Sequence, residues 1–208
     1  MIFGARASCG TAFAIVLLST VTGSIVGCLS GIMGGVADTV IMRLTDVFLA
    51  LPALILAMAL TATLGPSLTN ALLAIAIVRI PAYVRLARSQ TLALRSRNYV
   101  KASRTFGASS FYLLRWHILP NALSPIIVQA TLDLGGTILA AAALSFIGLG
   151  AQPPTAEWGA MVSSGRNFFL DHWWYATFPG FAILVSAIGF NLLGDGLRDL
   201  LDPKLGPR

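Results

Sequence analysis

Two long stretches of the chain carry no charged side chain, and this pattern constrains the fold more than any other feature. Residues 7–37 contain no Asp, Glu, Lys or Arg, and neither do residues 47–78. An apolar run of about 20 residues can cross the hydrocarbon core of a bilayer as a helix. The chain is 56% hydrophobic and 11% charged, whereas soluble domains carry about 25% charged residues. We therefore expect a multi-spanning membrane protein, not a soluble enzyme, a disordered chain or a nucleic-acid-binding domain.

The apolar runs predict an all-α fold, a bundle of five membrane-spanning helices. The runs are continuous, whereas the strands of a membrane barrel alternate, and helices satisfy their backbone hydrogen bonds within the bilayer. Gly65-Pro66 interrupts the second charge-free stretch, because proline removes a backbone donor. Pro52 and Pro81 are expected to kink spans. The predicted spans are residues 11–32, 46–64, 67–85, 121–146 and 174–194.

Basic residues gather between the third and fourth spans and indicate the orientation. Cytoplasmic loops of membrane proteins carry an excess of Lys and Arg, so this loop and the C-terminus are expected in the cytoplasm. The N-terminus is then outside, and we expect that a preceding span is missing from this chain. The basic residues between the two spans are Arg85, Arg88, Arg95, Arg97, Lys101, Arg104 and Arg115, with no acid among them.

Residues 86–120, the basic loop, are predicted to form two short helices joined by a glycine elbow. Gly107 suits the left-handed end of the first helix, and Ser109 or Ser110 can cap the second. Pro120 is expected to stop that helix or to open the next span. Apolar and basic residues alternate along the loop, which suits docking into a partner's groove or lying on the membrane surface.

The basic loop resembles the "EAA" loop of bacterial ABC importer permeases. Ala102, Gly107, Leu119 and Pro120 fit the spacing of that motif, whereas Lys101 and Ser103 stand where Glu and a second Ala are usual. Residues 148–161 resemble the external loop of the dipeptide/oligopeptide/nickel permease subfamily, and residues 190–203 resemble its C-terminal end. The resemblance covers about residues 4–203 and is strongest to the C-type permease of the pair, which has six spans.

This resemblance implies a type I ABC importer transmembrane domain over residues 4–199, with a cytoplasmic tail at 200–208. It implies a permease subunit of the bacterial inner membrane that carries small peptides, and it implies three kinds of partner besides the lipid bilayer. These are a second permease, cytoplasmic ATP-binding subunits and an extracytoplasmic substrate-binding protein; nucleic acid is not a partner. The residues expected to dock against the ATPase are Tyr99, Val100, Lys101, Ala102, Ser103, Phe106, Gly107, Leu119 and Pro120.

The chain itself is not expected to be an enzyme or to hold a cofactor. Its sequence lacks a Gly-x-x-x-x-Gly-Lys-[Ser/Thr] phosphate loop, so ATP hydrolysis is expected in a partner. The two histidines, His117 and His172, fall on opposite sides of the membrane, so no metal site is predicted. Cys9 and Cys28 lie in an apolar stretch and are expected to be packing residues.

Charged side chains within spans are candidates for function. Arg79 and Asp133 lie in the third and fourth spans, and we expect them either to line the translocation path or to pair within the bundle. Small residues at Gly23, Gly27 and Gly31 predict close helix packing. An outer aromatic belt is expected at Trp158, Trp173 and Trp174.

Alternative functions remain open at this point. Similar permeases carry nickel chelates, glutathione or D-amino-acid dipeptides. A self-contained secondary transporter driven by an ion gradient is a different class, and it is disfavoured because the sequence shows no inverted repeat and few intramembrane charges.

Overall fold

The computed structural model describes residues 1–201, and within this range the chain is built from helices. The predicted tail from 202 onward, including Lys204, lies outside the described residues. A π-helical turn, Leu114–Ile118, and a short 3₁₀ turn, Arg166–Phe168, supplement the α-helices. The α-helices are α1 (Ile2–Met33), α2 (Gly35–Ala50), α3 (Ala53–Leu64), α4 (Leu68–Arg95), α5 (Asn98–Thr105), α6 (Ser110–Leu113), α7 (Leu119–Phe146), α8 (Trp158–Gly165) and α9 (Trp174–Leu201).

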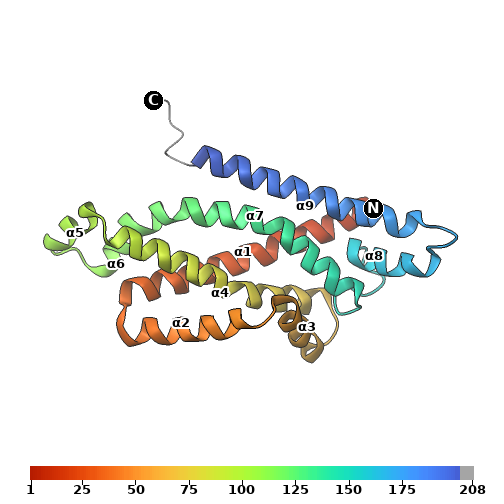
Figure 1. Cartoon of the computed structure of the whole chain (residues 1–208), viewed down its shortest axis with the longest axis horizontal. Helices are drawn as coiled ribbons and strands as arrows, with labels where there is room; N and C mark the ends of the chain where they lie inside the picture. Colours follow the sequence, from red (N-terminus) through yellow and green to blue (C-terminus); the bar gives the residue numbers. More distant parts are fainter. Residues whose placement is uncertain (202–208) are drawn as a thin grey trace.

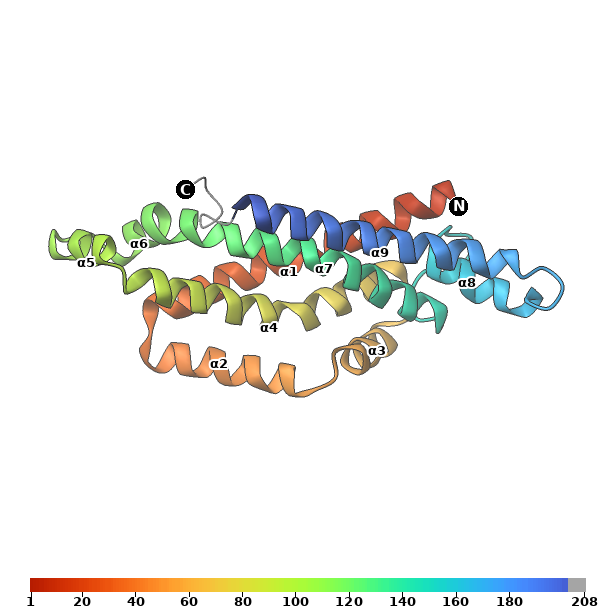
Figure 2. The same cartoon turned by 45° about the horizontal axis from the view of Figure 1, so that its top comes forward.

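Four long helices, α1, α4, α7 and α9, run along the length of the molecule (Figure 1). The short helices α5 and α6 lie at one end, called here the loop end, and α8 lies at the other, called the α8 end. The N-terminus is near the α8 end in both views (Figure 2). The helices α1, α4 and α9 run from the α8 end to the loop end, and α7 runs the opposite way. The chain returns between α1 and α4 through α2 and α3, so the alternation that the sequence predicts for spans joined in series holds only when this pair is counted.

The predicted helical bundle is confirmed, and its helices are longer than the apolar runs. Within residues 1–201, four helices are long and apolar enough to cross a membrane: α1, α4, the continuous segment from Ser110 to Phe146, and α9. α1 begins at Ile2 and α4 continues to Arg95, beyond the predicted boundaries near 11 and 85. Polar residues at helix ends prolong a helix without adding to its apolar run.

The second predicted span, residues 46–64, is wrong as a single helix. The chain forms α2 and α3, which meet at an angle of 93° and reach the length of a span only as a pair. The break lies at Leu51, which is extended with φ −93° and ψ 141°. The helical region is disfavoured for a residue that precedes proline, and Leu51 leaves that region, so α2 ends before Pro52 instead of only kinking there. By contrast, Pro81 lies inside α4.

Close packing of α1 on α4 confirms the role predicted for the small residues of the first span. A Cβ atom built at Gly23 would lie 2.5 Å from the Tyr83 Cβ, and one at Gly31 would lie 2.8 Å from the Thr91 Cβ. Both distances are shorter than real contacts of this kind. The two helices approach this closely because glycine leaves the space that a side chain would need.

Ion pairs fasten α2 to α4 near the loop end. Arg88 binds both carboxylate oxygens of Asp38, which also accepts a hydrogen bond from Ser30. Arg85 pairs with Asp46 at 2.6 Å, with more than half of each side chain exposed. These contacts hold α2 along the bundle although Thr45 is its one buried residue.

At the α8 end, a buried carboxylate ties α8 to α1. Glu157 is 2% exposed and accepts hydrogen bonds from the Ser8 hydroxyl at 3.0 Å and the Ala160 amide at 2.9 Å. Trp158, beside it, is buried against α1, α7 and α9. The predicted belt position of Trp158 is therefore wrong, because its ring fills the core. Trp173 and Trp174 are exposed.

Candidate functional site

The elbow of the basic loop forms as the sequence predicts. Gly107 follows α5 in the left-handed region, with φ 86°, a conformation that costs other residues a steric clash. Ser109 then caps α6 by accepting a hydrogen bond from the Tyr112 amide at 3.2 Å. The turn between α5 and α6 is therefore fixed by local chemistry.

The second predicted short helix is not separate, whereas Pro120 opens the next span, one of the two outcomes expected for it. α6 continues through the π-helical turn into α7, where Pro120 lies in the first turn. A proline inside an α-helix removes one backbone hydrogen bond, and its ring clashes with the preceding turn. At Pro120, the wider π-helical turn lies just before the proline. The loop end is thus the start of one long helix that runs to Phe146.

The predicted docking residues fall into three groups in the structure. Val100 is 1% exposed, so it packs inside the chain and does not contribute to a free face as predicted. Ser103 and Leu119 are half-buried. The exposed members are Tyr99, Lys101, Ala102, Phe106, Gly107 and Pro120.

An aromatic surface at the loop end extends beyond the predicted residues. The His117 ring lies between Tyr99 and Tyr112, with centroid distances of 6.1 and 5.7 Å. Phe106 is 91% exposed. Phe111 and Trp116 are also exposed and were not predicted, although they alternate with the buried Leu113 and Ile118 at helical spacing. A hollow of about 670 Å³ opens among these rings, lined by Ser103, Phe106, Gly107, Ala108, Ser109, Tyr112 and His117.

The two intramembrane charges meet each other. Arg79 of α4 lies 3.3 Å from the Asp133 carboxylate of α7, and both side chains are about one-fifth exposed. The Tyr83 hydroxyl donates to the same carboxylate at 2.8 Å, and the Gln129 amide donates at 3.2 Å. Gly136 leaves room beside the guanidinium, since a Cβ there would lie 3.5 Å from an Arg79 nitrogen. Sequence reasoning named the two charges but missed Tyr83 and Gln129, each one helical turn away.

A groove leads from the loop end towards this ion pair. It has a volume of about 830 Å³ and lies among α4, α7 and α9. Its wall carries amide and hydroxyl groups from Gln90, Asn121, Ser124 and Gln129, and Arg97 and Arg198 also line it. A smaller hollow of about 230 Å³ beside it is lined by Tyr83, Gln129 and Asp133, with Ala82 and Leu86.

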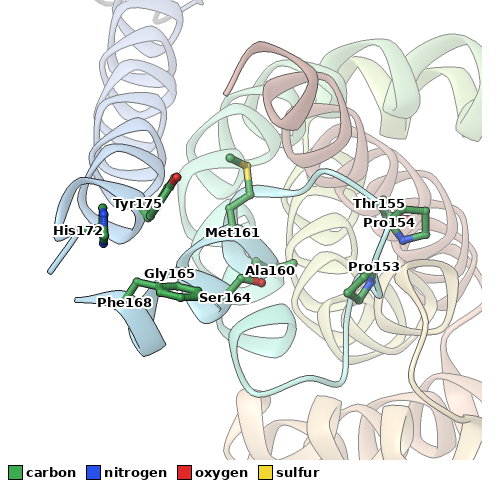
Figure 3. A pocket seen from close by; sticks show the side chains of 10 residues that line it. All are labelled: Pro153, Pro154, Thr155, Ala160, Met161, Ser164, Gly165, Phe168, His172 and Tyr175. Atoms are coloured by element: carbon green, nitrogen blue, oxygen red, sulfur yellow. Dashed lines mark hydrogen bonds between the residues drawn. The ribbon is translucent and has the colours of Figure 1, made fainter. Parts of the chain in front are cut away.

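A third hollow lies at the α8 end, between α8 and the start of α9 (Figure 3). It measures about 570 Å³ and is mostly apolar, with Met161 and Phe168 on one side and Pro153 and Pro154 on the other. His172, in the turn before α9, and Tyr175, in the first turn of α9, close it. Among residues 1–201, no three His, Cys, Asp or Glu side chains gather as a metal site would require.

The family assignment rests on a match over most of the chain. The model of a family described as binding-protein-dependent transport system inner membrane component matches residues 23–207. The chain belongs to this family. The recognition of an importer permease from the basic loop and the external segment is therefore confirmed.

Relatives of the chain are permease proteins of peptide transport systems. The probable D,D-dipeptide transport system permease protein DdpC of Escherichia coli is 60% identical over 99% of this chain and 69% of that relative. The di/tripeptide transport system permease protein DppC of Pseudomonas aeruginosa is 50% identical over 99% of this chain and 68% of the relative. The dipeptide permease DppC of Haemophilus influenzae is 49% identical, with coverages of 99% and 70%.

Solved structures share the fold. A chain of the MetNI methionine ABC transporter, in an inward-facing conformation, aligns with a TM-score of 0.76 and covers 97% of this chain and 95% of that one, at 18% identity. An amino acid ABC transporter aligns with a TM-score of 0.71 over 95% of this chain and 92% of that one, at 16% identity. At these identities the likeness concerns the fold alone.

Proposed function

We propose that the chain is one of two membrane-spanning subunits of an ATP-driven importer and that the cargo of this importer is short peptides. The peptide cargo is supported by the relatives, which are named for D,D-dipeptide, di/tripeptide and dipeptide transport. Family membership supports the remaining parts of the complex: a second permease, ATP-binding subunits and a binding protein on the outer side.

One observation carries the mechanical part of the proposal: the loop end is rigidly joined to the membrane bundle. α6, the π turn and α7 form a continuous helix of 37 residues, and the Gly107 elbow sets α5 at its start. A partner that pushes on the exposed rings of Phe106 and Phe111 therefore moves α7 itself. A flexible linker would absorb the same movement, whereas a helix transmits it.

The basic character of the loop end supports its place on the cytoplasmic side, where Lys and Arg accumulate. Lys101 and Arg104 are exposed on α5, and residues 86–120 contain no acid. Burying these cations against a partner requires acidic groups in the partner's cleft. We therefore place Asp or Glu residues on the ATP-binding subunit opposite Lys101.

Growth on peptides tests the proposed function. A strain that lacks its own peptide importers and requires an external amino acid is given that amino acid only as a dipeptide, in parallel L,L and D,D forms. Co-expression of the complete importer with this chain is expected to restore growth on at least one form, and omission of this chain abolishes it. Uptake of a nickel chelate or glutathione, without peptide uptake, would overturn the peptide cargo.

A further inference from the structure

The environment of Asp133 differs from that of an ion pair buried in a bundle core. Its two carboxylate oxygens accept from Arg79, Tyr83 and Gln129, yet Gln129 is itself exposed. The pair therefore lies at an open face of the chain, where α4 and α7 border a hollow.

The hollow beside Asp133 adjoins the larger groove. Leu86 and Gln129 line both spaces, so the groove that opens at the loop end reaches Asp133. On α4, Arg79, Tyr83, Leu86 and Gln90 follow each other at steps of three or four residues and therefore share one helix face. This face of α4 and the facing wall of α7 enclose the approach to Asp133.

The polar lining of the groove argues against lipid as its neighbour. Asn121 and Ser124 of α7 face it, as does Gln90 of α4. Amide and hydroxyl groups turned towards hydrocarbon lose their hydrogen bonds with water, which is unfavourable. The same groups are satisfied when the groove holds water or a polar solute.

We propose that Arg79 and Asp133 form a binding site for the two charged ends of a short peptide in transit. The peptide's ammonium group takes the place of the Arg79 guanidinium at Asp133, and the peptide's carboxylate binds the guanidinium so released. This assignment rests on the proposed peptide cargo and deepens it to two named residues. Tyr83 and Gln129 remain on the carboxylate and hold it in position while the partners exchange.

The arrangement keeps the site neutral whether it is empty or loaded. An isolated charge in the membrane is costly, and the empty site avoids this cost by closing Arg79 onto Asp133. A zwitterion offers one charge of each sign, so both residues find a new partner when the pair opens. A neutral solute offers neither, which makes the exchange selective for molecules with a free amine and a free carboxylate.

A double variant without either charge, called here the neutral pair, distinguishes this role from that of a purely structural ion pair. In Arg79→Gln/Asp133→Asn, both charges are removed together, so neither residue is left as an unpaired charge, and the amide oxygen introduced at position 133 can still accept from Tyr83. The matched control is Arg85→Gln/Asp46→Asn, which neutralises an ion pair between α2 and α4 that lies away from the groove. Both variants are assembled with the complete importer in proteoliposomes.

The measurement compares dipeptide uptake with ATP hydrolysis stimulated by the binding protein. The neutral pair is expected to keep assembly and stimulated hydrolysis but to lower uptake at subsaturating peptide by at least about tenfold, because hydrogen bonds to charged groups are lost. The control is expected to match wild type in both readouts. Wild-type uptake in the neutral pair would overturn the site, whereas absence of uptake in wild type itself would overturn the peptide cargo instead.

A second measurement does not depend on removing the charges. In a background of Cys9→Ala and Cys28→Ala, Leu86→Cys, which lines both spaces, is treated with a charged thiosulfonate reagent. Ile127→Cys, exposed but in the lining of neither space, serves as the control. The groove predicts fast labelling at 86, slowed by dipeptide, and slow labelling at 127. Equal labelling at the two positions, or no protection by peptide in a complex that transports it, would contradict the proposal.

Discussion

The close approach of α1 to α4 predicts a large effect from one added methyl group. In Gly27→Ala, the new Cβ would lie 2.3 Å from the Val84 carbonyl oxygen and 2.9 Å from the Ala87 Cβ. Ordinary contact begins near 3.4 Å, so the helices must separate by about 1 Å at this point. Overpacking of this kind costs about 1–3 kcal/mol.

Gly10→Ala is the matched control, because Gly10 lies in the same helix and a Cβ there meets nothing within 4 Å. Alanine favours a helix over glycine by about 0.5–1 kcal/mol, so this variant is expected to equal or exceed wild type. The assay is unfolding of the purified complex in mixed micelles with increasing denaturing detergent, followed by the loss of helical signal. Equal stability of the Gly27 and Gly10 variants would refute the packing argument.

Three further predictions concern the two ends of the bundle. Glu157→Ala removes the buried carboxylate that caps α8, so it should lower the free energy of unfolding by about 1–3 kcal/mol. Asp171→Ala, at an exposed site, should leave the free energy of unfolding unchanged, and equal stability of the two variants would mean that Glu157 does not hold α8. Gly107→Val forces a β-branched residue into a left-handed turn, so its ATP-driven uptake should fall well below that of Gly107→Asn, because asparagine tolerates this conformation. Similar uptake rates in the two variants would show that the elbow is not needed. Lys101→Glu should reduce co-purification of the ATP-binding subunit more than Lys101→Gln does, and stronger binding would contradict an acidic cleft.

The membrane helices were predictable because the apolar runs that identify them are long. The same signal could not place the junction of α2 and α3, since residues 47–64 carry no charge on either side of Pro52. Whether a proline kinks or ends a helix depends on the packing around it: Pro81 stays inside α4, whereas the chain turns by 93° near Pro52. Local sequence does not contain that difference.

The candidate site was predictable in its charges and not in its contacts. Arg79 and Asp133 stood out because ionisable residues are rare in spans, but their pairing depends on how α4 faces α7. Tyr83 and Gln129 carry no comparable signal, because tyrosine and glutamine occur in many helices without such a role. Val100 was misassigned for a similar reason, since the apolar face of α5 divides between the chain's own core and the free surface.

The central claim is that this chain forms the membrane pathway of an ATP-driven peptide importer. Its most direct test is the accumulation of a labelled dipeptide by vesicles that contain the complete complex and the binding protein. Uptake is expected to require hydrolysable ATP, to persist when ionophores collapse the ion gradients, and to disappear when this chain is omitted. Uptake that continues without ATP and stops with the ionophores would contradict the claim and indicate an ion-coupled transporter.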